Sequence, residues 1–94
     1  MPIPEDLQKA WDDANSLMTE KNDPEAALEI LRAAWDSIEN DNQKAKTLAL
    51  AADAGTELGV LDPDNQKSHW QKAYRNYNES MAIDPKNKDI RRNM

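Results

Sequence analysis

The sequence contains no cysteine, one histidine and two glycines among its 94 residues. The lack of cysteine excludes disulfides and thiolate metal ligands, and the single His69 disfavours a histidine-based metal or catalytic cluster. No apolar run approaches the roughly 18 residues of a membrane span, and the first residues lack the basic and apolar regions of a signal peptide. We therefore expect one small cytoplasmic domain over residues 1–94, with no cofactor, no metal and no membrane contact.

Acidic residues outnumber basic ones by 18 to 12, and the excess lies in the first half of the chain. Residues 1–47 carry eleven acids and five bases, whereas residues 48–94 carry seven of each. Nucleic-acid-binding proteins have the opposite balance, so no nucleic acid partner is expected. The basic tail leaves contact with nucleic acid or a membrane surface as a weaker alternative, through Lys86, Lys88, Arg91 and Arg92.

The spacing of apolar residues predicts an all-α protein, because no segment alternates in the manner of a strand. Proline and Asx residues divide the chain into four predicted helices. The first runs from Pro4 or Glu5 to about Met18, and the second from Pro24 to about Ile38. The third begins after Asn40-Asp41-Asn42 and ends at Gly59 or in the 61–65 stretch, and the fourth runs from about Gln66 to Ile83. Short connections favour antiparallel neighbours, which predicts two helical hairpins.

The two hairpins carry the same pattern. The motif Trp11-x2-Ala14-Asn15-x2-Met18 recurs, degraded, 34 residues later as Ala45-x2-Leu48-Ala49-x2-Ala52. In the second helix of each hairpin, Ala27, Leu31 and Ala34 correspond to Ala73, Tyr77 and Ser80. A fixed period of this length indicates repetition of one helical hairpin. Alanine at the crossing points lets the paired helices approach closely, and Trp11 and Tyr77 are predicted core residues.

This pattern resembles the tetratricopeptide repeat, whose consensus runs W-x2-L-G-x2-Y, then A-x3-F and a final P. Trp11, the segment 27–35 and the segment from Ala73 to Pro85 carry the resemblance, while Ala14-Asn15 replaces Leu-Gly and Glu39 replaces the first proline. It implies repeat one at about 8–41 and repeat two at about 42–85. The 46-residue offset from Ala27 to Ala73 places an insertion near 57–68, and the tail 86–94 would form a short capping helix.

The resemblance implies a non-enzymatic protein-interaction module, in which the first helices of the repeats line a groove. The implied partner-binding residues are Lys9, Asp12, Asp13, Ser16, Thr19, Glu20, Lys46, Thr47, Leu50 and Asp53, with Gln43 and Glu57 adjoining. Acids predominate in this set, so we expect a protein or peptide partner with basic and some apolar character. Asp12 and Ser16 occupy two positions of a family clamp for C-terminal carboxylates, which is therefore expected to be absent.

The remaining motifs indicate structural roles rather than metal binding or catalysis. The segment Asp62-x-Asp64-x-Gln66 begins like a calcium loop but has no glycine at the sixth place and Ala73 at the twelfth, so a helix-connecting turn is expected. No Ser-His-Asp arrangement, glycine-rich phosphate loop or apolar carboxylate pair supports an enzyme. The alternative function is a structural or oligomerisation domain, or a fragment of a longer repeat protein, with homo-oligomers formed through an exposed apolar end.

Overall fold

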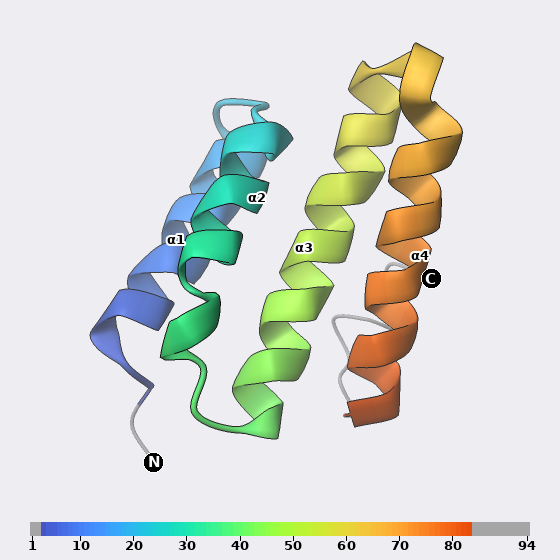
Figure 1. Cartoon of the computed structure of the whole chain (residues 1–94). Coiled ribbons are helices and arrows are strands. Elements are labelled where there is room, and N and C mark those ends of the chain that lie inside the picture. The colour runs from blue at the N-terminus through green and yellow to red at the C-terminus, as the bar shows by residue number, and fades with distance from the viewer. Residues whose placement is uncertain (1–2, 84–94) are drawn as a thin grey trace.

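The chain folds into four α-helices joined by short turns (Figure 1). The structure, a computed structural model, describes residues 3–83, and no strand occurs among them. The helices are α1 (Glu5–Thr19), α2 (Pro24–Ala33), α3 (Asp41–Leu61) and α4 (Gln66–Ile83), with the 3₁₀ turns η1 (Trp35–Ser37) and η2 (Pro63–Asn65) between them. The predicted all-α class is confirmed. The predicted capping helix of the tail lies outside the described residues.

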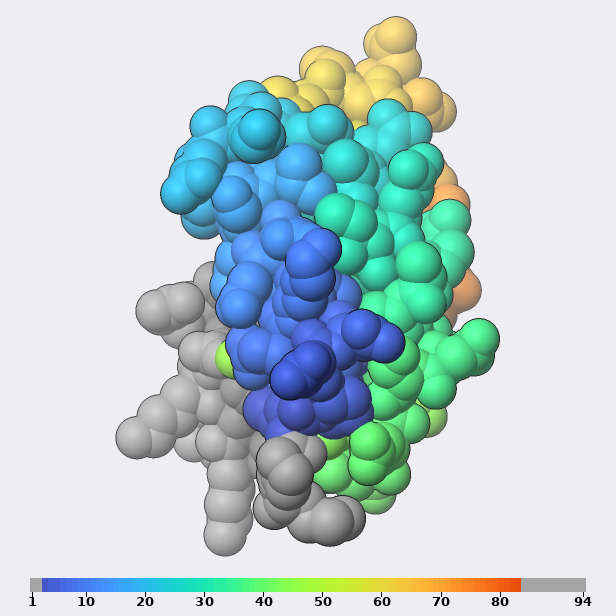
Figure 2. Space-filling model, turned by 90° about the vertical axis from the view of Figure 1, so that its left-hand side faces the viewer, coloured from blue at the N-terminus to red at the C-terminus, as the bar shows by residue number. Residues whose placement is uncertain are grey.

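The helices form two antiparallel hairpins, α1–α2 and α3–α4, and α3 lies between the first hairpin and α4 (Figure 1). The first helices of the hairpins, α1 and α3, run in the same direction. Seen from the side of the first hairpin, α1 and α2 cover the front of the molecule, and the α3–α4 turn projects above them (Figure 2). Because α3 contacts all three other helices, it is the central element of the fold.

The helices begin where the polar residues before them can cap the free backbone N–H groups. The Asp23 carboxylate accepts a hydrogen bond from the Ala26 backbone N–H at 3.2 Å, with Pro24 in the first turn. The Asn40 side-chain oxygen accepts one from the Gln43 N–H at 2.9 Å. The cap at Asp23 confirms the predicted start of α2, and α3 begins at Asp41, within the Asn40–Asn42 segment rather than after it. Loss of such a cap costs roughly 1 kcal/mol.

The larger hydrophobic core lies between the first hairpin and α3. Its buried side chains are Leu7, Ala10, Trp11, Ala14, Ala27, Leu31, Ala34, Leu50 and Ala54. Trp11 is also hydrogen-bonded: its Nε1 donates to the Thr47 hydroxyl at 2.9 Å, and that hydroxyl donates to the Gln43 carbonyl at 2.8 Å. The predicted core position of Trp11 is confirmed, and its buried polar atom has a partner, as burial requires.

A second cluster joins α3 to α4 and is built from three alanines and one tyrosine. It contains Ala49, Ala52, Ala73 and Tyr77. Gly55 lies opposite Ala73, where a Cβ added to the glycine would stand 3.2 Å from the Ala73 Cβ. The Ser80 hydroxyl donates to the Ala45 carbonyl at 2.6 Å, which is possible only at close helix approach. Small side chains therefore set the short separation of α3 and α4, and Tyr77 is a core residue as predicted.

The positions matched by the sequence repeat have matching environments. Five pairs are buried in both hairpins: Trp11 and Ala45, Ala14 and Leu48, Ala27 and Ala73, Leu31 and Tyr77, Ala34 and Ser80. Two pairs differ: Asn15 is exposed whereas Ala49 is buried, and Met18 is half-buried whereas Ala52 is buried. The physical reason is that α3 has neighbours on two sides, whereas Asn15 lies on a face of α1 that none of the described helices covers.

The extra residues of the second hairpin lengthen both of its helices and leave the length of the inter-helix segment unchanged. Thr19, shifted by the 34-residue offset, corresponds to position 53, yet α3 continues eight residues further to Leu61. Pro24, shifted by 46, corresponds to Trp70, yet α4 begins four residues earlier at Gln66. The inter-helix segments 20–23 and 62–65 have equal length. The insertion therefore raises the α3–α4 turn beyond the end of the first hairpin (Figure 1).

The second helix ends earlier than its apolar pattern predicts. The pattern continues to Ile38, but α2 stops at Ala33 and is followed by the 3₁₀ turn η1. Ile38 has an extended backbone and packs against the larger core from that conformation. The apolar spacing persists through the turn because the chain remains in contact with the core while it reverses direction, so the spacing overstates the length of the helix.

Candidate functional site

A polar groove lies between α1 and α3 and has Tyr77 of α4 at its base. Its lining residues are Asn15, Met18 and Thr19 from α1, Asp53, Thr56 and Glu57 from α3, and Tyr77. We call this hollow, of about 550 Å³, the α1–α3 groove. It exists because α1 and α3 contact each other less extensively than α3 contacts α2 or α4. The groove therefore presents side chains from three helices to one ligand.

One hydrogen bond organises the base of the groove. The Tyr77 hydroxyl donates to the Asp53 carboxylate at 2.5 Å, and such a bond to a charged acceptor is short and strong. Burial, together with this bond to the ionised Asp53, raises the pKa of Tyr77 above its ordinary range. Tyr77 is therefore a neutral donor at physiological pH, and it holds the Asp53 carboxylate beside the groove.

Two of the ten residues predicted to bind a partner line this groove. They are Thr19 and Asp53, and the adjoining candidate Glu57 lines it as well. Sequence reasoning did not select Asn15, Met18, Thr56 or Tyr77. The spacing of Asn15, Met18 and Thr19, three and four residues apart, was the available signal, because it places them on one helix face.

Lys9 and Asp13 lie on a different side of α1. They form an ion pair at 3.5 Å and line a separate shallow hollow together with Ile30 and Ala33 of α2. The predicted set is thus divided between two faces of α1. The turn of the helix explains the separation, since Lys9 and Asp13 share one row, whereas Asn15 and Thr19 share another.

Three further predicted residues lie along the outer side of α1 and interact within the helix. Asp12 accepts a hydrogen bond from the Gln8 amide at 3.0 Å. The Ser16 hydroxyl donates to the Glu20 carboxylate at 2.8 Å. None of the three lines the α1–α3 groove, although Asp12 and Glu20 are exposed and add negative charge near it.

Thr47 and Leu50 were predicted to lie on the surface, but the structure places both in the core. Their side chains are 1% and 8% exposed, so a partner cannot reach them. Thr47 is held by Trp11, and Leu50 belongs to the core shared with the first hairpin. Lys46 is half-buried, with its ammonium 5.5 Å from the Trp11 ring centroid in a cation–π contact. The face of α3 that was predicted to bind a partner is thus partly used for packing.

The segment Asp62–Gln66 forms the predicted helix-connecting turn. The Asp62 carboxylate is 3.0 Å from His69 Nε2 and accepts a hydrogen bond from the Asn65 amide at 3.0 Å. These bonds, that of His69 above all, lower the pKa of Asp62. Over residues 3–83, no group of three potential metal-ligating side chains occurs. Within the same range, no helix is long and apolar enough to cross a membrane.

No protein-family model, curated protein or solved structure matches this chain. The structure itself defines an all-α protein of two packed helical hairpins over residues 3–83, with a polar groove between α1 and α3.

Proposed function

We propose that this protein is a non-enzymatic interaction module of the tetratricopeptide-like kind, and that the α1–α3 groove binds a polypeptide segment with basic and apolar side chains. The observation that carries the proposal is the lining of the groove. Asp53 and Glu57 place two carboxylates one helical turn apart, opposite the apolar side chain of Met18. A basic side chain with an aliphatic neighbour complements this arrangement.

The charge of the chain supports the same choice of partner. The net charge is −6, and Asp12 and Glu20 add exposed carboxylates on α1. Such a field raises the association rate of a cationic ligand and disfavours an anionic one. The effect weakens as salt screens the charges over about 10 Å at 0.1 M ionic strength, so binding should be salt-dependent.

The repeat-like arrangement supports the proposed class. Five matched positions are buried in both hairpins, and α3 packs on the preceding hairpin as a further repeat would. Helical-hairpin arrays present extended surfaces to polypeptide partners. The proposal assigns no chemical step and no cofactor to the groove.

A peptide titration tests the proposal. A fluorescently labelled peptide containing alternating lysine and leucine is titrated with the protein and followed by anisotropy, beside an acidic peptide of equal length. We expect the basic peptide to bind more tightly, and Glu57→Lys to weaken it by roughly three- to tenfold, since close charge pairs are worth about 1 kcal/mol at a surface. Tighter binding of the acidic peptide would refute the assignment.

The matched control is Glu29→Lys, which makes the same charge change at an exposed position of α2 outside the groove. Both variants change the net charge by the same amount, so Glu29→Lys should weaken binding only through that change and therefore far less than Glu57→Lys. Equal effects of the two variants would mean that net charge, rather than the groove, attracts the peptide.

A further inference from the structure

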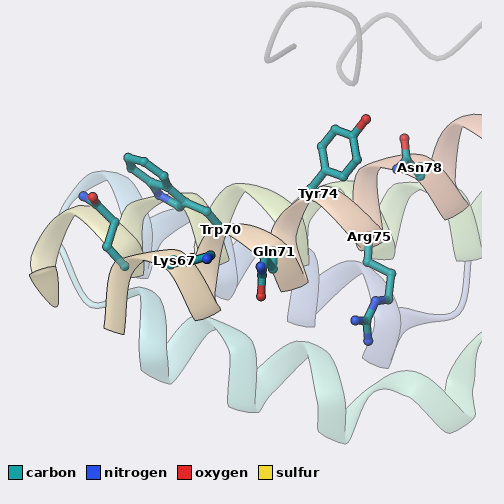
Figure 3. A pocket seen from close by; sticks show the side chains of 7 residues that line it. Lys67, Trp70, Gln71, Tyr74, Arg75 and Asn78 are labelled. Carbon is teal, nitrogen blue, oxygen red and sulfur yellow. The ribbon is translucent and has the colours of Figure 1, made fainter. Parts of the chain in front are cut away.

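The outward side of α4 carries two aromatic side chains, Trp70 and Tyr74, that the elements within residues 3–83 leave partly exposed. Trp70 and Tyr74 are one turn apart, 44% and 62% exposed, and they lie on one side of the helix (Figure 3). Together with neighbouring polar side chains they line a shallow surface hollow, which we call the α4 outer face: Lys67, Trp70, Gln71, Tyr74, Arg75 and Asn78. Exposed aromatic residues with arginine beside them have the composition of interface centres.

The internal repeat shows what covers the equivalent face of α2. By the 46-residue offset, Trp70 corresponds to Pro24 and Tyr74 to Leu28. Pro24 is buried and Leu28 is half-buried. Leu28 packs into the core that contains Leu50 and Ala54 of α3, the next helix along the array. In the first hairpin, therefore, this face receives a helix with small and aliphatic side chains.

A second copy of this chain is a poor occupant for the α4 outer face. The helix that would have to dock is α1, which corresponds to α3 by the 34-residue offset. Where α3 has Leu50 and Ala54, α1 has Ser16 and Glu20, so its corresponding face is polar. Symmetric pairing of two α4 helices would instead bring the Lys67 and Arg75 side chains of both copies together, which like-charge repulsion opposes.

The charges around the two aromatic rings indicate the chemistry of the partner. Lys67 and Arg75 line the same hollow as the aromatic rings, and in Figure 3 Arg75 extends from the side of α4 opposite to Tyr74, so the cations flank the aromatic row rather than lie within it. Both side chains are exposed. A docking helix would therefore gain from carboxylates at the edge of its apolar stripe, positioned to meet these cations.

We propose that the α4 outer face is a docking surface for an amphipathic helix of another polypeptide, with small and aliphatic residues on one face and carboxylates along its edge. Trp70 and Tyr74 supply the apolar contact, and Lys67 and Arg75 select for acidic flanks. This surface is separate from the α1–α3 groove and takes a ligand of opposite charge.

The test uses helical peptides based on residues 41–61, the segment that packs on α2 in this protein. The acidic probe carries Lys44→Glu and Lys46→Glu, and the basic probe carries Asp53→Lys and Glu57→Lys. Each labelled probe is titrated with the full chain and followed by anisotropy. We expect the acidic probe to bind at least roughly tenfold more tightly, and Tyr74→Ser to weaken it by about tenfold, as loss of an aromatic anchor does.

Three variants of the protein locate the binding. The double variant Lys67→Glu, Arg75→Glu should reverse the preference between the probes. Leu61→Ala, at an exposed apolar residue outside the α4 outer face, should leave binding unchanged. Glu57→Lys in the α1–α3 groove should not weaken the acidic probe, which keeps this test independent of the proposed function. Tyr74→Ser is the principal variant because Trp70 also supports the fold, through its contact with Gly59.

Several results would overturn the proposal. One is equal affinity for the two probes, or binding that Tyr74→Ser leaves unchanged. Another is concentration-dependent dimerisation, measured by light scattering, that Tyr74→Ser abolishes, because the face would then be covered by a second copy. The last is Tyr74-dependent binding to vesicles of anionic phospholipid without binding of the acidic probe, which would make the surface a membrane contact.

Discussion

The indole of Trp70 on α4 lies against Gly59 on α3, and its Nε1 donates a hydrogen bond to the Thr56 carbonyl 3.2 Å away. A Cβ on Gly59 would stand 2.5 Å from Cδ1 of the indole, closer than side-chain atoms approach. The absence of a side chain at Gly59 therefore leaves the space that the Trp70 indole occupies. This contact joins the lengthened parts of α3 and α4, where the Gln66 amide also donates to the Gly59 carbonyl at 3.3 Å.

Replacing Gly59 with alanine should displace the indole. Alanine favours the helix by about 0.5–1 kcal/mol, but the protein loses the hydrogen bond, worth about 0.5–1.5 kcal/mol, and part of the indole burial. We expect a net loss of about 1 kcal/mol in the free energy of unfolding, with a shifted Trp70 indole N–H resonance in NMR spectra. In a Trp70→Ala background the same substitution should stabilise the protein. If Gly59→Ala stabilised the protein both with Trp70 and with Trp70→Ala, the glycine would not be needed to accommodate the indole.

The buried hydrogen bond between Trp11 and Thr47 should make a measurable contribution to stability. Thr47→Val keeps the shape of the side chain but leaves the Trp11 Nε1 without its acceptor, and an unsatisfied buried donor costs about 1–3 kcal/mol. Urea denaturation should show this loss, and the loss should shrink in a Trp11→Phe background. Thr19→Val is the matched control because Thr19 is exposed, and it should change stability by no more than about 0.5 kcal/mol.

The two alanines at the hairpin crossings should be equally intolerant of a larger side chain. Ala27 and Ala73 are 0% and 2% exposed, and extra methylene groups in a packed core cost about 1–3 kcal/mol. Ala27→Leu and Ala73→Leu should therefore lower the melting temperature, while Ala82→Leu on the exposed side of α4 should not. If Ala27→Leu lowered the melting temperature and Ala73→Leu did not, the helix crossings of the two hairpins would not be equivalent.

Tyr77 should make the protein less stable at alkaline pH. Its pKa is raised in the folded state by burial and by the bond to Asp53, whereas in the unfolded state it is near 10. Its contribution is therefore complete below about pH 10 and declines as the pH rises towards the folded-state value. Urea denaturation from pH 8 to pH 11 should show this decline.

Tyr77→Phe should reduce that alkaline slope and cost about 0.5–1.5 kcal/mol at neutral pH, because the hydrogen bond is lost. Tyr74→Phe is the control, since Tyr74 is 62% exposed. An unchanged slope in Tyr77→Phe would assign the alkaline loss to other groups.

The sequence predicted the fold class well because its signals act locally. Asp23 and Asn40 can cap a helix wherever the chain goes next, and the buried pairs Ala27 with Ala73 and Leu31 with Tyr77 follow from spacing along one helix. The predictions that depended on a neighbouring helix were less accurate. Thr47 was assigned to a partner-binding face by its position in the repeat, yet the Trp11 indole provides the partner that permits its burial.

The amino-acid sequence by itself determined the four helices, most of their bounds and the matched register of the two hairpins, since caps, proline and apolar period operate within a few residues. Only the tertiary structure decided which faces stay open to a partner. The limited contact between α1 and α3 leaves the α1–α3 groove, and among residues 3–83 no helix follows α4 to pack on its outer face. Both depend on contacts between residues far apart in the chain, which no local pattern encodes.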